Sequence, residues 1–427
     1  DRHGIRILGT SAEGIDIAED RERFDELLER FHISRPKGMG VQTLPEALHA
    51  AQTLGYPVLL RPSYVIGGQN MKIVHDDAEV TTYMQRILAQ GIDNPVLVDK
   101  YMMGTELEVD VISDGTDVLI PGIMEHIERA GVHSGDSIAV YPPQTLSSKV
   151  IYTIIDYTKR LALSLHVKGL LNIQFVVVDG EVYIIEVNPR SSRTVPFLSK
   201  VTNVDMVGIA TRIAMGHTLK ELGYKSGLVP PKPYVAVKAP VFSFAKMTDV
   251  DIALGPEMKS TGEVMGIDYH YARALYKAII GSGIHVPTKG CILFTVADKD
   301  KEEMKQLAKA FAELGFEICA TEGTAKAIQS MGIDAEIVGK VHERSSDIIQ
   351  MIKNGKINMV INTLTQGKHS AKDGFKIRRA TVEHGIACLT SLDTAWEVLR
   401  VLSFMRERRL VYSLAIQDYV GGGDELA

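Results

Sequence analysis

Oxygen-bearing side chains interrupt two apolar runs in the segment 172–190. Gln174 stands in the first run, and Glu186 and Asn188 stand in the second. Because strand side chains alternate between the two faces, Glu186 and Asn188 share one face. One carboxylate and two amide oxygens suit Mg²⁺, which takes its remaining ligands from water and phosphate. The pattern predicts a metal–nucleotide site with Gln174, Glu186 and Asn188 as metal ligands; the alternative is a polar, solvent-facing side of a hairpin.

Gln174 joins Glu186 only for certain turns at Asp179-Gly180, a dipeptide typical of hairpins. A strict two-residue turn places Gln174 on the opposite face from Glu186. A three-residue loop that starts at Val178, with Gly180 left-handed, instead brings Gln174 diagonal to Glu186. We therefore expect this bulged loop, or another of odd length.

Other stretches hold groups that suit a nucleotide. Arg61 ends a strand-like run just before two glycines, which is a plausible phosphate contact. The glycine-bracketed loop 131–135 offers backbone N–H groups to phosphates. Met102 fits a flat adenine ring, and Glu106 suits ribose hydroxyls. Arg193 closely follows the metal residues, where phosphoryl transfer needs charge neutralisation. Each has an ordinary alternative, such as a surface arginine, a loop histidine or a core methionine.

Two regions of different character position these groups. Before residue 285 the pattern is mixed α and β with hairpins, and after it helices and strands alternate regularly, which predicts a small doubly wound α/β domain. The predicted helices are 20–31, 45–54, 301–314, 324–331, 371–384 and 391–404. The predicted strands are 56–61, 95–98, 106–113, 172–178, 182–187, 292–296, 316–320, 357–362 and 386–389.

Composition excludes several classes of protein. The chain has 427 residues, with 47 basic and 53 acidic side chains, and this net charge of −6 disfavours a dedicated nucleic-acid binder. No apolar run reaches the ~18 residues of a membrane helix. The three cysteines are scattered, which disfavours a disulfide framework and fits a reducing, cytoplasmic setting. The chain starts at Asp1 and runs directly into an apolar stretch, so we expect a piece of a longer protein.

These stretches, in this order, resemble the ATP-grasp superfamily and, more closely, the large subunit of carbamoyl phosphate synthetases. The resemblance spans nearly the whole chain, and its final part resembles a methylglyoxal-synthase-like allosteric domain, which indicates the carboxy-terminal half of that subunit. It implies a remnant of a preceding subdomain or linker at 1–19, an α+β ATP-grasp domain at 20–284 and the allosteric domain at 285–427. The motifs that carry the resemblance are residues 61–68, 122–128, 131–136, 185–196 and 260–266.

The resemblance also implies residue roles. The metal ligands for Mg²⁺ or Mn²⁺ are again Gln174, Glu186 and Asn188, and potassium is implied near Glu106, His126 and Ser137. The catalytic residues are Arg193, Arg61 and Glu186. The residues implied to contact ATP are Arg61, Lys100, Met102, Glu106, Gly131, Val132, His133, Ser134, Gln174 and Glu186.

In the final domain the resemblance implies an effector site for a nucleotide or sugar phosphate. Thr321-Glu-Gly-Thr324 leads into a predicted helix, whose first N–H groups suit a phosphate. We find no acid pair for methylglyoxal-type chemistry near Asn362, so we interpret the domain as regulatory. The implied effector residues are Lys301, Thr321, Thr324, Lys340, Asn362 and Thr363.

The implied activity is phosphorylation of carbamate by ATP, as part of a glutamine-dependent synthetase that feeds pyrimidine and arginine synthesis. The implied partners are a glutaminase small subunit, the amino-terminal half of the large subunit and, as an open alternative, further copies of the chain; nucleic acid and membrane are not expected. Two other hypotheses remain. One is a fragment that binds nucleotide and effector without turnover, and the other is a different ATP-grasp ligase, such as biotin carboxylase.

Overall fold

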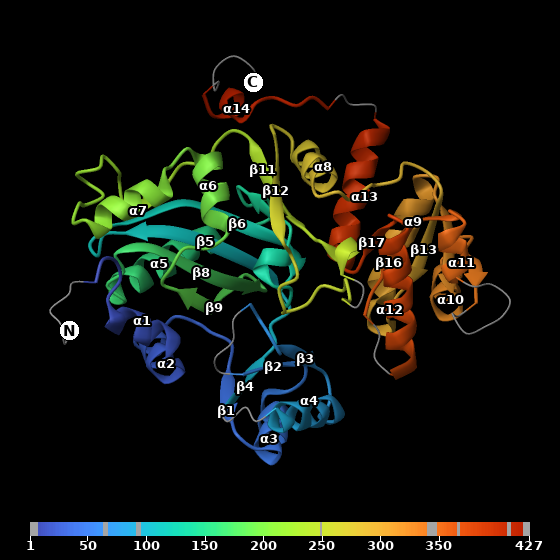
Figure 1. The fold of residues 1–427 in the computed structure, drawn as a ribbon, viewed down its shortest axis with the longest axis horizontal. Coiled ribbons are helices and arrows are strands. Elements are labelled where there is room, and N and C mark those ends of the chain that lie inside the picture. The colour runs from blue at the N-terminus through green and yellow to red at the C-terminus, as the bar shows by residue number, and fades with distance from the viewer. Residues whose placement is uncertain are drawn as a thin grey trace. The chain divides into compact units, whose positions relative to one another are not determined.

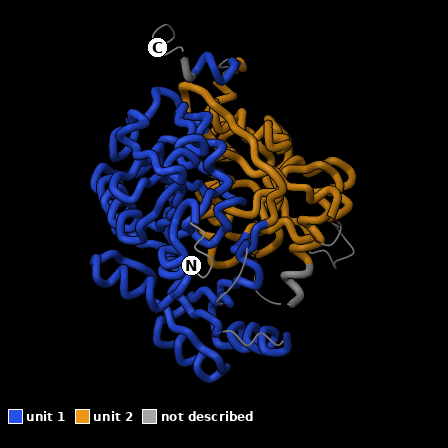
Figure 2. Tube along the Cα trace, turned by 60° about the vertical axis from the view of Figure 1, so that its left-hand side comes forward, with its two compact units in different colours: residues 1–236, 255–258, 414–427 blue, residues 237–254, 259–413 orange. Residues whose placement is uncertain are grey.

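A computed structural model describes residues 7–62, 67–90, 95–247, 250–339, 348–364, 368–407 and 411–421. The chain forms two compact units (Figure 2): unit 1 comprises 1–236, 255–258 and 414–427, and unit 2 comprises 237–254 and 259–413. The segment 237–284 thus clusters mainly with the final domain rather than with the first. No helix among the described residues is long and apolar enough to span a membrane.

The first sheet of unit 1 is antiparallel, with strand order β1-β4-β2-β3. Its strands are β1 (Gly38–Val41), β2 (Val58–Pro62), β3 (Lys72–Val74) and β4 (Val96–Lys100), and its helices are α3 (Leu44–Leu54) and α4 (Asp77–Ala89). Helix α3 starts with a capping box in which Thr43 and Glu46 satisfy each other's backbone N–H groups. Buried apolar side chains of both helices and of the strands form one core.

The second sheet of unit 1 carries most of the predicted site. Neighbouring strands follow the order β7-β6-β5-β8-β9, and Figure 1 shows β6, β5, β8 and β9 side by side. The strands are β5 (Thr105–Ser113), β6 (Val118–Arg129), β7 (Ala139–Tyr141), β8 (Gly169–Val178), β9 (Glu181–Asn188) and the short β10 (Gly227–Leu228), which pairs with β6. The remaining helices of the unit are α1 (Ala12–Glu19), α2 (Arg21–Arg30), η1 (Ser134–Asp136), α5 (Ser148–Ser164), α6 (Thr194–Thr202), α7 (Met206–Ala214) and α14 (Ile416–Gly421).

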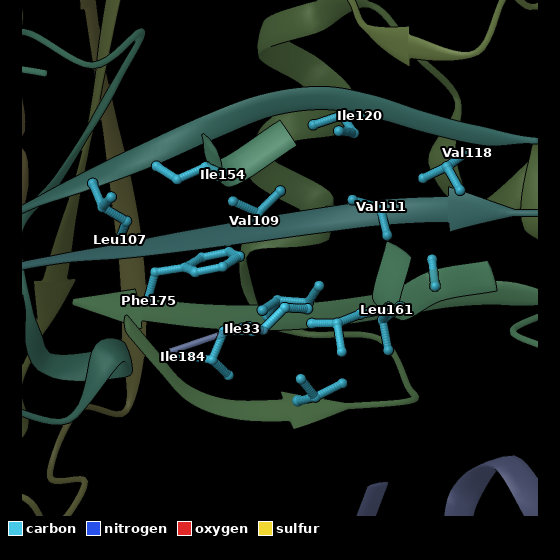
Figure 3. Packing of buried hydrophobic residues seen from close by; sticks show 14 of the residues in the cluster. Ile33, Leu107, Val109, Val111, Val118, Ile120, Ile154, Leu161, Phe175 and Ile184 are labelled. Carbon is cyan, nitrogen blue, oxygen red and sulfur yellow. The ribbon is translucent and has the colours of Figure 1, made fainter. Parts of the chain in front are cut away.

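The two faces of this sheet differ in chemistry. One face packs Leu107, Val109 and Val111 of β5 and Phe175 of β8 into a core with α5, as Figure 3 shows. The alternate residues of the same strands therefore face the other way, and these include the polar ones. Helices α6 and α7 contact the strands β5, β6 and β8.

Unit 2 contains the predicted doubly wound module. Its five strands are parallel, in the order β15-β14-β13-β16-β17, which confirms the predicted fold class. Helix α11 packs against α12, and α9 packs against α10 and α13. The elements of the module are β13 (Cys291–Thr295), η3 (Asp298–Asp300), α9 (Lys301–Glu313), β14 (Glu317–Thr321), α10 (Glu322–Gln329), β15 (Glu336–Val338), α11 (Ile348–Lys353), β16 (Ile357–Asn362), α12 (Lys368–Glu383), β17 (Ala387–Leu389) and α13 (Leu392–Arg406).

The sequence segment before this module adds further structure to unit 2. Strand β12 (Gly262–Asp268) neighbours β11 (Val235–Val241), whose first two residues belong to unit 1. The short helix η2 (Phe244–Lys246) and the helix α8 (Tyr271–Gly281) complete the unit, and α8 packs against α13. Lys277 donates to the buried Asp268 at 2.8 Å, which ties α8 to the end of β12.

Candidate ATP and effector sites

The hairpin β8–β9 corrects the predicted turn. Val178 pairs with Glu181, so the turn is a strict two-residue turn, and Asp179 and Gly180 have φ of 52° and 79°. These two positive values are those of a type I′ turn. The predicted three-residue loop was therefore wrong, because Gly180 is not the only left-handed residue and Val178 remains in the ladder.

The extra residue lies inside strand β9 instead. Phe175 pairs with Ile184, but Gln174 pairs with Glu186, so Ile185 is a β-bulge. The bulge changes which residues of β9 face the core: Ile184 lies in the core before it and Val187 after it. Gln174 consequently lies directly opposite Glu186, which is closer than the predicted diagonal.

The three predicted metal ligands lie on one face of the sheet. Asn188 Nδ2 donates to Glu186 Oε1 at 2.9 Å, and Arg190 donates to Asn188 Oδ1 at 3.2 Å. Gln174 Nε2 donates to Ser134 Oγ at 3.0 Å, which connects the strand to the glycine-bracketed loop. The side chains therefore gather at one place rather than pointing apart.

This donor set fits a hard divalent cation. Among the described residues, no group of three or more His, Cys, Asp or Glu side chains is arranged to hold a metal ion. A cation here would therefore depend on one carboxylate and two amide oxygens, with phosphate oxygens and water as the other ligands. That mixture is the one Mg²⁺ prefers.

A buried polar layer supports this face, and the sequence interpretation missed it. Asn172, which pairs with Asn188 across the ladder, donates to Glu108 at 2.9 Å and to Asp110 at 3.1 Å. Asn172, Glu108 and Asp110 are 1–3% exposed, and Thr194 donates to Glu108 at 2.8 Å. Alternation alone could have found Asn172, because it is two residues before Gln174.

The glycine-bracketed loop is fixed by several backbone contacts. His133 N–H donates to the carbonyl of Gly255 at 2.8 Å, and Gly135 N–H donates to His133 Nδ1 at 3.0 Å. A Cβ on Gly135 would lie 3.3 Å from the Arg193 guanidinium, so that predicted catalytic arginine lies beside the loop. Gly131 and Val132 are half-buried members of the same turn. The loop, Arg193 and the metal residues thus form one site.

Arg61 is held by a shared carboxylate on β4. Its Nε donates to Asp99 Oδ2 at 3.0 Å, while the Arg21 guanidinium reaches Asp99 Oδ1 at 2.7 Å. Burial acts to lower the pKa of Arg21, but attraction to Asp99 outweighs it and the pKa lies above its ordinary value. Asp99 and Arg21 were not identified from the sequence, because helix α2 and strand β4 are distant along the chain.

The predicted adenosine contacts are more dispersed. Lys100 Nζ donates to the carbonyl of Gly55 at 2.8 Å, and Met102 is half-buried. Glu106 is 4% exposed, and its carboxylate lies 3.7 Å from His126 Nδ1, beside the predicted potassium position. The roles of these residues stay predictions.

The predicted effector residues converge at the carboxyl ends of the parallel strands. Thr363 Oγ1 accepts from Ala297 N–H at 2.8 Å, and Asn362 Nδ2 donates to Thr295 Oγ1 at 3.3 Å. Thr321 occupies the N-cap position of α10 without a side-chain capping bond, and its hydroxyl donates to Thr324 Oγ1 at 3.5 Å. Such an edge of an open α/β sheet is where ligands usually bind.

Two lysines were also predicted to contact the effector. A Cβ on Gly323 would meet Lys301 Nζ at 3.2 Å, so this ammonium lies over the start of α10. Lys301 also pairs with Asp298 at 2.6 Å. Lys340 lies outside the described residues, and its role stays a prediction.

Two parts of the chain match family models of known sequences. Residues 20–222 match the family described as carbamoyl-phosphate synthase L chain, ATP binding domain, and residues 303–390 match the MGS-like domain. The chain has the domain architecture of the carboxy-terminal half of the carbamoyl phosphate synthetase large subunit. This architecture confirms the resemblance inferred from the motifs.

Solved structures support the ATP-grasp fold. The chain is similar to biotin carboxylase from Campylobacter jejuni, solved as a β-γ-ATP complex, with a TM-score of 0.52, 17% identity and coverage of 65% of this chain and 68% of that chain. It is also similar to the biotin carboxylase domain of the Hydrogenobacter thermophilus 2-oxoglutarate carboxylase, solved with MgADP, ADP and bicarbonate. That match has a TM-score of 0.51, 18% identity and coverage of 65% of this chain and 68% of that chain. At such identities these likenesses establish the fold alone.

Proposed function

We propose that the chain phosphorylates carbamate with ATP, giving carbamoyl phosphate and ADP, as the carboxy-terminal half of a glutamine-dependent carbamoyl phosphate synthetase. The observation that carries this proposal is the alignment of Gln174, Glu186 and Asn188 on one face beneath the loop that contains Ser134. The MGS-like domain favours this reaction over biotin carboxylation. In that setting the chain works in the cytoplasm with a glutaminase subunit and an amino-terminal half, and it supplies pyrimidine and arginine synthesis.

The residues of the chain have distinct tasks in this reaction. A carbamate oxygen attacks the γ-phosphorus, the bond to the β–γ bridging oxygen breaks, and ADP leaves with that electron pair. Arg61 and Arg193 neutralise the charge that develops on the phosphoryl oxygens. The loop 131–135 donates N–H groups to the phosphates and excludes water, which protects carbamate from decomposition. Mg²⁺ or Mn²⁺, held by Gln174, Glu186 and Asn188, would supply charge neutralisation at the phosphates, and K⁺ would lie near Glu106.

The reverse reaction tests this proposal directly. ATP formation from carbamoyl phosphate and ADP with Mg²⁺ is measured for the wild-type chain, for Glu186→Gln and for Glu181→Gln. Glu181 is a matched control on the same strand, because it is exposed and pairs with Lys149 at 3.2 Å. We expect Glu186→Gln to lose about 1,000-fold in rate and Glu181→Gln to retain the wild-type rate. Near wild-type activity of Glu186→Gln contradicts the metal assignment.

The two alternative hypotheses give different results in the same assay. A chain that binds nucleotide without turnover makes ATP only when it is assembled with the amino-terminal half. A biotin carboxylase hydrolyses ATP in a manner that depends on bicarbonate and free biotin, whereas the proposed synthetase half does not respond to biotin. Running both assays on one preparation separates the three hypotheses.

A further inference from the structure

Two cysteines that are far apart in the sequence lie in contact inside unit 2. Cys291 is the first residue of β13, and Cys319 lies on the neighbouring strand β14. These strands are parallel and Cys319 pairs with Leu293, so the two cysteines are diagonal neighbours on one face of the sheet. Their sulfur atoms are 3.0 Å apart, within hydrogen-bond distance, and both thiols are free. The fold thus pairs two cysteines that sequence spacing left scattered.

The two thiols of this pair differ in their surroundings. Cys291 is 8% exposed at the end of its strand, whereas Cys319 is fully buried. The hydrogen bond from Cys319 lowers the pKa of Cys291, and the same bond together with burial raises the pKa of Cys319. Because the thiolate is the nucleophilic form of cysteine, Cys291 is the reactive member and Cys319 stays protonated beside it.

A cavity lies close to the more exposed thiol. It has a volume of about 370 Å³ and is lined by the segment that precedes β13 and by the turns that follow α11 and α12. Ile357, which pairs with Cys291 across the ladder, lines this cavity, and so does Ile352 from the core cluster that contains both cysteines. A small molecule in the cavity is therefore separated from Cys291 by a single side chain. The cavity lies at the amino ends of the strands, at the opposite edge from Asn362 and Thr363.

We propose that Cys291 and Cys319 form a modification site, a thiol pair that hydrogen peroxide oxidises reversibly to a disulfide between β13 and β14. Peroxide is the oxidant because it is small and uncharged, whereas a bulky disulfide oxidant would need to reach thiols that are almost entirely buried. A reversible disulfide agrees with a reducing setting, in which cytosolic disulfides are usually transient. The inference is independent of carbamate phosphorylation, because neither cysteine belongs to the ATP or effector residues.

The oxidation balances in two steps. The Cys291 thiolate attacks one oxygen of hydrogen peroxide, the O–O bond breaks, and the departing hydroxide takes up a proton to give water, which leaves Cys291 as a sulfenic acid. The sulfur of Cys319 then attacks the sulfenic sulfur, the S–O bond breaks, and the proton of Cys319 leaves with that hydroxide as a second water. Two thiols and one peroxide thus give one disulfide and two waters. Because the two sulfurs are already in contact, the second step competes with further oxidation of Cys291.

Peptide mapping of the full wild-type chain tests the proposal. The folded chain is treated with hydrogen peroxide, the remaining thiols are blocked with iodoacetamide, and trypsin is added without reductant. Cleavage after the flanking lysines gives peptide 290–299 with Cys291 and peptide 310–326 with Cys319. We expect one cross-linked species that lacks two hydrogen atoms and that dithiothreitol separates into the two peptides. Peptides that stay unoxidised, or that carry only sulfinic or sulfonic acid, overturn the proposal.

Three single variants assign the roles of the thiols. Cys319→Ala should stop at a sulfenic acid on Cys291, which dimedone traps, and Cys291→Ala should leave Cys319 unoxidised. Cys388→Ala is the matched control, because β16 separates its strand β17 from β13, and it should form the same cross-link as the wild type. In the wild type we expect peroxide to consume Cys291 about tenfold or more faster than Cys388. Equal rates at these two thiols, or oxidation of Cys319 in Cys291→Ala at the wild-type rate, contradict the assignment.

Two further controls separate this site from unspecific oxidation. Glutathione disulfide replaces peroxide in one, and we expect no cross-link in the time that peroxide needs to complete it; equal rates with both oxidants overturn the role of peroxide. In the other, near-ultraviolet circular dichroism follows the chain during oxidation. A cross-link that forms only as the tertiary signal is lost shows that the folded chain does not carry the site. If a variant does not fold, the wild-type peptide map decides the proposal.

Discussion

Each unit has one buried asparagine at the centre of its candidate site, and the two are used with opposite electrostatic sign. Asn172 turns its amide nitrogen toward the carboxylates of Glu108 and Asp110. Asn362 turns its amide oxygen toward the guanidinium of Arg378. A surrounding rich in carboxylates suits a cation, and one rich in guanidinium and ammonium groups suits an anion. In each site, the group that orients the neutral amide is opposite in charge to the ligand proposed for that site.

Replacing each asparagine by leucine tests this contrast with the largest expected effect on the free energy of unfolding. Asn172→Leu removes the donor shared by two buried carboxylates, so we expect a loss of about 3 kcal/mol in the free energy of unfolding. Asn362→Leu should cost about half as much, because Arg378 keeps its bidentate bond to Asp251. Urea unfolding of both variants measures the difference. Equal losses would show that the carboxylate pair is not held by Asn172.

Asn172→Leu should also affect the reaction. Asn188 Nδ2 lies 3.4 Å from Asn172 Oδ1, so the leucine removes one of the contacts that orient a metal ligand. Mutation of residues behind metal ligands typically changes metal affinity or activity by 10- to 100-fold. We therefore expect the Mg²⁺ concentration that gives half the maximal rate of ATP formation to rise about 30-fold. Asn362→Leu should leave the Mg²⁺ dependence unchanged.

Two left-handed glycines of unit 1 provide a second contrast. Gly68 has φ of 70°, and a Cβ there would meet a carbonyl oxygen, so we expect Gly68→Ala to cost about 2 kcal/mol and to raise the KM for ADP. Gly180→Ala is the control, because its φ is 79° but nothing lies within 4 Å of its Cβ position. It should cost only about 1 kcal/mol and leave the KM unchanged. An unaltered KM for ADP in Gly68→Ala would show that the loop with Gly68 is not part of the ATP site.

The two sites also differed in how far the sequence predicted them. At the ends of parallel strands, position follows from topology, so Thr321, Asn362 and Thr363 were brought together as expected. On an antiparallel sheet, position depends on register. The two-residue turn alone would place Gln174 on the opposite face from Glu186, and the bulge at Ile185 returns it to the same face. The sequence did not predict Asp99 and Arg378. Both residues contact segments that are far apart in the chain, and local spacing of residue types carries no information about such contacts.

The ion pair of Arg378 gives unit 2 a specific pH dependence. The pKa of Asp251 lies below the ordinary value of 3.8, so its stabilising effect is complete above that value and is lost as pH falls through the lower, folded-state pKa. Asp251 is one-third exposed, so we expect the pair to contribute about 1 kcal/mol or less. Acid unfolding of the wild type and of Asp251→Asn between pH 6 and about 3 measures it. Parallel curves for the two proteins would show that the pair adds no stability.

The smallest expected effect is an increase in stability rather than a loss. Gly323 is helical and its Cβ position meets only the flexible end of Lys301, at 3.2 Å. Gly323→Ala should therefore stabilise α10 by about 0.5 kcal/mol, since alanine is the better helix former. The same methyl group displaces the Lys301 ammonium from the start of the helix, so binding of inorganic phosphate should weaken several-fold. A variant that is more stable and still binds phosphate with wild-type affinity would show that the anion does not bind at the start of α10. The electrostatic contrast would then no longer hold for the site of Asn362.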